Sequence, residues 1–244
     1  MIGAVVAIAL VVALVVYGLV AWERIVKRHR EQDPATAGGS MARAHAARPA
    51  ATPDAPRSFA RGDWLAVRTN DTERVVAALG LRTVLPANWR AGLAEAATAG
   101  VFVTPPVRGF VFATGADLGA ALGPHVHTLP ALLERLAATF PELAWFRADA
   151  ANDRHGWALV RRGAVERVYA YDGDDGHVAW HGEPTEAERE LGCFVDDPRD
   201  LSDDEVKWWP DAALVAEVAA AWSLDPRSID RLAIAPSAGW LGRL

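Results

Sequence analysis

The sequence contains a single cysteine, Cys193, so the chain has no intrachain disulfide. A lone cysteine is typical of a protein in a reducing compartment. Lysine is almost as scarce, because only Lys27 and Lys207 are lysines among the 25 basic residues. Together with the abundance of alanine, the preference for arginine indicates a GC-rich bacterial genome.

The sequence also lacks the short motifs that commit a protein to a particular chemistry. It has no P-loop and no G-x-G-x-x-G for a nucleotide. It likewise has no G-x-S-x-G for a nucleophilic serine, and no H-E-x-x-H or C-x-x-C for zinc. We therefore expect no cofactor and no metal, and no catalytic residue can be assigned from a motif.

Charge is absent from the N-terminal stretch between Ile2 and Trp22. As a helix rising 1.5 Å per residue, this stretch would be roughly 31 Å long, which matches a hydrocarbon core of about 30 Å. We therefore predict a transmembrane helix over residues 2–22. A cleaved signal peptide is the alternative, but it would begin with a basic segment and have an apolar core of only about 7–15 residues.

Basic residues follow the predicted span and none precedes it; they are Arg24, Lys27, Arg28 and Arg30. The positive-inside rule then places the N-terminus outside the cell and the rest of the chain in the cytoplasm. Residues 23–61 are rich in Ala, Pro, Gly and Arg, and their eight basic and four acidic residues give a net charge of +4. This composition predicts a basic, disordered tether beside the anionic inner leaflet.

The remaining residues, 62–244, are acidic. They contain 17 basic and 27 acidic residues, a net charge of −10. Binding DNA or RNA requires a basic surface, so this charge argues against a nucleic-acid partner. A segment of about 180 residues is long enough to form one soluble domain with its own core.

Short apolar runs joined by turns alternate with helical segments along residues 62–244, which predicts an α+β domain. A mainly antiparallel sheet with flanking helices is expected, because tight turns outnumber crossover connections. Capping boxes are expected at Asn70–Glu73 and Thr185–Glu188. We expect strands within 64–68, 101–104, 109–114 and 143–181, and helices within 73–79, 89–98, 129–140, 186–191 and 211–222.

Histidines and the cysteine offer only weak catalytic candidates. His125 and His127 form an H-x-H pair in a loop, for which we favour a surface or capping role over a metal site. A hydrolase in which His155 or His177 meets a carboxylate only in the fold is the alternative. Cys193 has acidic neighbours that would raise its pKa, so a small buried residue is its expected role.

Tryptophan supplies the candidate binding residues. Trp208 and Trp209 form a bulky pair in the most acidic part of the chain, and exposed aromatic residues are favoured anchors of protein interfaces. The alternative is that both rings fold back over the core, where tryptophan is usually buried. Asn88 and Trp89, at the start of the second expected helix, are a weaker case of the same kind.

Three segments carry a resemblance: WLAVRTNDTERVVAALGL, GVFVTPPVRGFVFATG and GEPTEAERELG. Together they resemble an uncharacterised domain of hypothetical bacterial membrane-anchored proteins, over about residues 62–235. The resemblance implies no activity and no site residues. It agrees with a bacterial origin.

These observations lead to three hypotheses of function. The first is a membrane-anchored cytoplasmic domain that is a non-catalytic protein-interaction module, held by the bilayer through residues 2–22. The second is a hydrolase-type enzyme with a histidine–carboxylate site. The third is an immunity-type protein that binds a basic toxin, because acidic compact domains neutralise basic toxins.

Overall fold

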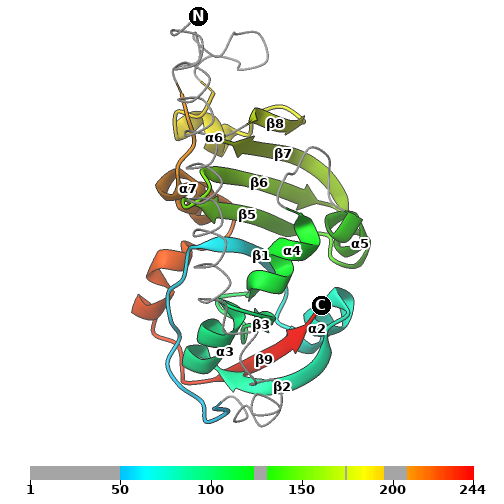
Figure 1. Cartoon of the computed structure of the whole chain (residues 1–244), viewed down its shortest axis with the longest axis vertical. Coiled ribbons are helices and arrows are strands. Elements are labelled where there is room, and N and C mark those ends of the chain that lie inside the picture. The colour runs from blue at the N-terminus through cyan, green and yellow to red at the C-terminus, as the bar shows by residue number, and fades with distance from the viewer. Residues whose placement is uncertain (1–49, 124–130, 174, 195–207) are drawn as a thin grey trace, which may run out of the picture. The chain divides into compact units, whose positions relative to one another are not determined.

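The computed structural model describes residues 50–123, 131–173, 175–194 and 208–244 (Figure 1). The predicted transmembrane span, residues 2–22, lies outside these ranges. Within them, no helix combines the length and the apolar character needed to cross a bilayer.

One nine-stranded sheet forms the centre of the described domain, and every strand pair in it is antiparallel. The strand order is β2-β9-β3-β4-β1-β5-β6-β7-β8, which places the first strand in the middle and the last strand between β2 and β3. The strands are β1 (Gly62–Arg68), β2 (Arg82–Asn88), β3 (Val101–Val103), β4 (Phe110–Thr114), β5 (Leu143–Asp149), β6 (Arg154–Arg161), β7 (Ala164–Asp172), β8 (Gly176–His181) and β9 (Ala238–Arg243).

Both faces of the sheet are buried, because apolar side chains point to both sides of the central strands. In β1, Trp64 and Ala66 face one core, whereas Leu65 and Val67 face the other. The Leu65 side is covered by α2 (Thr72–Leu79), α4 (Ala116–Leu122) and α5 (Ala131–Thr139). The Trp64 side is covered by α3 (Trp89–Ala96), α7 (Ala212–Trp222) and the 3₁₀ helix η2 (Pro226–Arg231), with α6 (Glu186–Glu190) beside α7.

The α+β fold with a mainly antiparallel sheet and flanking helices is confirmed, including the β3–β4 hairpin and the β5–β8 meander. The capping box at Thr185–Glu188 is also confirmed. The capping box expected at Asn70–Glu73 is wrong: Asp71 is the N-cap of α2, and its side chain accepts a hydrogen bond from the backbone N–H of Arg74. An aspartate one residue further on therefore takes the position that we assigned to the asparagine.

Three elements were not expected from the sequence: β2, α4 and β9. Strand β2 contains Pro86, which cannot donate a ladder hydrogen bond and is tolerated because β2 is an edge strand. Strand β9 contains Gly239 and Gly242, which weaken a strand pattern. A Cβ on Gly239 would lie 2.2 Å from the carbonyl oxygen of Val103, so the close approach of β3 requires glycine there.

The folded unit begins upstream of residue 62, because residues between 50 and 61 contact the rest of the domain. The segment 50–61, which the sequence places in the tether, runs along the domain to β1 (Figure 1). Asp54 accepts hydrogen bonds from the backbone N–H groups of Trp89 and Arg90 at 2.7 and 3.1 Å. The ring of Phe59 contacts those of Trp64 and Phe112. Sequence composition missed these contacts because they come from a few isolated residues.

Candidate functional site

Trp209 is the exposed large hydrophobic residue of the described chain, with 46% of its surface accessible. Its ring lies 5.5 Å from that of Tyr171 on β7. Trp208 is half-buried and packs on Phe194 and Tyr169, with centroid distances of 4.6 and 5.8 Å. Each of the two alternatives therefore holds for one of the rings: Trp208 folds back over the core, and Trp209 remains on the surface.

Acidic side chains lie near the part of the sheet on which Trp209 packs. Asp211 is the exposed N-cap of α7 and accepts a hydrogen bond from the backbone N–H of Leu214. Asp153, in the β5–β6 turn, contacts His155, which lies opposite Tyr171 in the β6–β7 ladder, and both Asp153 and Asp211 act electrostatically on that histidine. Asp149 is in register with Arg154 and Asp172, so it lies on the other face of the sheet. We call Trp209, Asp153 and Asp211 the Trp209 surface.

His155 lies beneath the Trp209 surface, opposite Tyr171 in the β6–β7 ladder. Only 2% of it is exposed, and its Nε2 lies 3.3 Å from Oδ1 of Asp153. Burial lowers the pKa of His155, against the opposing effect of the three aspartates. The histidine–carboxylate contact that the hydrolase hypothesis requires is therefore present, but the ring is enclosed in the protein.

A fully buried ion pair lies further along the sheet, between Arg167 on β7 and Glu188 on α6. Nε of Arg167 donates to Oε1 of Glu188 at 2.9 Å, and Nε1 of Trp157 donates to the same oxygen at 2.7 Å. The other carboxylate oxygen accepts from the backbone N–H of Thr185 at 2.6 Å, which closes the capping box. The guanidinium lies over Trp180, 4.2 Å from the ring centroid.

Cys193 is buried beside this ion pair, as its sequence neighbourhood indicated. Burial raises the pKa of its thiol to about 12, and the charge of Glu188 adds to the effect. A thiol that stays protonated at neutral pH is a poor nucleophile. The cysteine is therefore a packing residue of the core.

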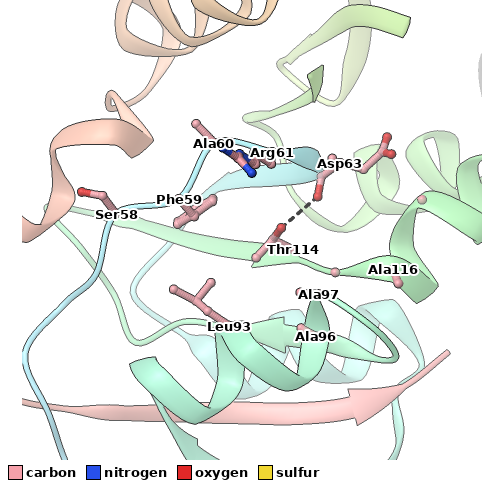
Figure 2. Close-up of a pocket in the computed structure, with 13 residues that line it drawn as sticks. Ser58, Phe59, Ala60, Arg61, Asp63, Leu93, Ala96, Ala97, Thr114 and Ala116 are labelled. Atoms are coloured by element: carbon pink, nitrogen blue, oxygen red, sulfur yellow. Dashed lines mark hydrogen bonds between the residues drawn. The ribbon is translucent and has the colours of Figure 1, made fainter. Parts of the chain in front are cut away.

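A cavity of about 590 Å³ lies where β1 begins, β4 ends and α4 starts (Figure 2). Its size is within the range of about 300–1,000 Å³ that is usual for ligand pockets. Most of its wall is apolar and made of small residues. The lining residues are Ser58, Phe59, Ala60, Arg61, Gly62, Asp63, Leu93, Ala96, Ala97, Thr114, Gly115, Ala116 and Gly119.

Asp63 connects this cavity to the core. Its Oδ1 accepts hydrogen bonds from Nε1 of Trp145 at 2.8 Å and from Nε of Arg147 at 3.0 Å. Burial raises the pKa of Asp63, whereas the charge of Arg147 opposes that rise. Its Oδ2 lies so close to Gly119 that a Cβ there would be 2.9 Å away, so a glycine in α4 makes room for the carboxylate.

Asn88 and Trp89, the weaker binding candidates, are both buried in the fold. The side chain of Asn88 caps α3 by accepting from the backbone N–H of Ala91, and it donates to the carbonyl oxygen of Thr52. Trp89 packs edge-on against Phe102. Neither residue is available as a surface anchor, because the start of α3 is covered by the segment 50–54.

The remaining histidine and metal candidates gain no support. The H-x-H pair, His125 and His127, lies outside the described residues. His177 is in β8, and His181 is exposed at the end of that strand. No group of three or more potential metal ligands occurs among the described side chains.

The residues that sequence reasoning missed are charged side chains buried in strands: Asp63, Arg147 and Arg167. A signal for each was present in the alternation of the strands. Arg147 is in phase with Trp145, and Arg167 is in phase with Tyr169, so each charge lies on a buried face. The partner of Arg167 could not be found in this way, because Glu188 lies on a helix and is 21 residues away in the sequence.

Taken together, the described part of the chain has an exposed aromatic residue with two aspartates nearby, an enclosed histidine and a largely apolar cavity. No protein-family model, curated protein or solved structure matches this chain.

Proposed function

We propose that this protein is a membrane-anchored, non-catalytic interaction module, whose cytoplasmic domain binds a positively charged protein through the Trp209 surface. The observation that carries the proposal is Trp209 itself, half-exposed and seated on Tyr171. A tryptophan of this kind is costly to leave in water and is a frequent hot spot of interfaces.

The charge of the domain supports a basic partner. Residues 62–244 have a net charge of −10, and Asp153 and Asp211, which both act electrostatically on His155, are part of the Trp209 surface. A lysine or arginine of the partner could pair with the carboxylates and also make a cation–π contact with the face of the indole ring. Arg154, the residue before His155 in the chain, is paired with Asp172, to which its Nε donates at 2.7 Å.

Affinity capture with the full-length chain in detergent tests this proposal. Wild-type protein is expected to recover a basic protein, and Trp209→Ala is expected to reduce its recovery at least tenfold, as for a hot spot of about 2 kcal/mol or more. Glu95→Gln, an exposed change on α3, is the matched control and should recover the partner normally. An identical set of captured proteins with wild type and Trp209→Ala would refute the Trp209 surface.

The purified partner then gives a second measurement. Affinity for the wild-type chain should fall as salt is raised from about 50 to 300 mM, since salt screens exposed charges. Asp211→Asn should make that fall less steep. An affinity that is independent of salt would contradict a basic partner.

An immunity-type protein is the second candidate, supported by the same acidic surface. In that case the captured basic protein would be a toxin, and the domain would block its activity. Inhibition that is lost with Trp209→Ala and kept with Glu95→Gln would support this candidate.

Membrane topology provides a separate test of the anchor. If residues 2–22 span the bilayer with the basic flank inside, protease added to intact spheroplasts should leave the C-terminal domain uncut. Disrupting the membrane should expose it to cleavage at the same protease concentration. Digestion of the domain in intact spheroplasts would place it outside and refute the proposed orientation.

A further inference from the structure

The cavity beside β1 has a polar side and an apolar side. Figure 2 shows Arg61, Asp63 and Thr114 along one side, with Leu93 and Ala96 on α3 opposite them. The apolar side is continued by Phe59, which packs against the Trp64 side of the core, and by the exposed Ala97 after α3. A molecule that fits here needs an apolar body and a polar group at one edge.

Small side chains line the cavity, and tight packing against the backbone requires a small residue at only some of these positions. Gly115 is required, because a Cβ there would lie 2.2 Å from the carbonyl oxygen of Gly100. Ala97 and Ala116 are exposed and Ala60 is half-buried, so larger side chains would fit at these positions without a clash in the core. The cavity is therefore more than a by-product of tight backbone contacts.

One uncompensated charge faces the cavity, and it is positive. Arg61 is exposed and has neither an ion pair nor a side-chain hydrogen bond within the described chain. The carboxylate of Asp63 is paired with Arg147 and turns away from Leu93 (Figure 2). The hydroxyl of Thr114 donates to the backbone oxygen of Asp63, which orients the wall beside Arg61.

We infer that this cavity binds a small organic carboxylate, with its apolar body on α3 and its carboxylate on Arg61. The positive charge of Arg61 and the apolar wall of the cavity both favour an organic carboxylate. A guanidinium pairs with a carboxylate through two parallel hydrogen bonds, whereas a wall of alanine, leucine and phenylalanine takes an aromatic or branched aliphatic body. The site is independent of the Trp209 surface, because the two share no residue.

Calorimetry on the full-length chain in nanodiscs tests the site, with empty nanodiscs as the blank. The probes are 2-naphthoate and its neutral analogue 2-naphthamide. Arg61→Gln should weaken naphthoate about tenfold, the equivalent of losing one charged hydrogen-bonded pair, and leave naphthamide within about twofold. Arg135→Gln, an exposed change on α5, is the matched control and should leave both affinities unchanged.

A second variant tests the cavity separately from the charge. Ala97→Leu places three more carbon atoms in the cavity and should weaken both probes at least fivefold, with the thermal midpoint of the domain unchanged. The inference would be overturned if naphthoate shows no saturable heat, or if Ala97→Leu binds it as wild type does. It would also be overturned if Arg61→Gln weakens the two probes equally.

Discussion

Replacing Glu188 by alanine is expected to lower the free energy of unfolding by about 3–5 kcal/mol, because it leaves a buried arginine without its counter-charge. Arg167 is fully buried and has no carboxylate partner other than Glu188 in the described chain. The same change removes the hydrogen-bond acceptor of Trp157 and opens the capping box at Thr185. Denaturant unfolding followed by tryptophan fluorescence measures the loss.

Two further variants separate charge from packing. Glu190→Ala, an exposed change two residues away on α6, should alter the unfolding free energy by no more than about 0.5 kcal/mol. The double variant Arg167→Met with Glu188→Leu should lose less than Glu188→Ala, since apolar residues of similar volume replace a buried pair at little cost. Equal losses for Glu188→Ala and Glu190→Ala would contradict the role assigned to the ion pair.

Replacing Arg147 by alanine is the second change with a large expected effect, again about 3–5 kcal/mol. It leaves the carboxylate of Asp63 buried, with Trp145 as its remaining side-chain donor in the described chain. Asp63→Asn in the same background should recover part of the loss, because the amide carries no charge to bury. Unfolding of the single and double variants at neutral pH gives this comparison directly.

The stability lost in Arg147→Ala should also depend on pH, in a direction that is set by the pKa of Asp63. That pKa is already raised above its ordinary value of 3.8 by burial, and removing Arg147 takes away the largest opposing effect. The folded variant then binds a proton more tightly than the unfolded chain, so its stability increases as pH falls through the folded pKa toward 3.8. The difference between Arg147→Ala and the double variant should shrink from about pH 7.5 to about pH 5. A difference that grows on acidification would contradict this account.

Both large effects arise from the same feature of the fold, a sheet covered on both faces. Charged side chains buried in its strands have no access to water, so each must find a partner within the protein. The cavity lies where β1 begins and β4 ends, and the Trp209 surface includes Asp153 in the turn between β5 and β6. The proposed binding sites are therefore at the margins of the layers, and the buried pairs are within them.

Local patterns in the sequence were sufficient for elements whose ends are marked by nearby residues. Helix α6 follows from the capping box of Thr185 and Glu188, and helix α7 from Asp211 before an apolar run. The β5–β8 meander follows from alternating strands and short turns. Strands β2 and β9 have no such signal, because they pair with each other across about 150 residues of sequence, and β9 also pairs with the distant β3.

Sequence alone also determined the charge layout, the anchor prediction and the choice of Trp208 and Trp209. It could not decide which of the two rings is exposed, since that depends on Tyr169, Tyr171 and Phe194 meeting them from other elements. Nor could it place Arg61 and Leu93 on one cavity, or Arg167 against Glu188. Composition and periodicity act over a few residues, whereas partners and cavities are set by contacts between distant segments, which only the tertiary structure brings together.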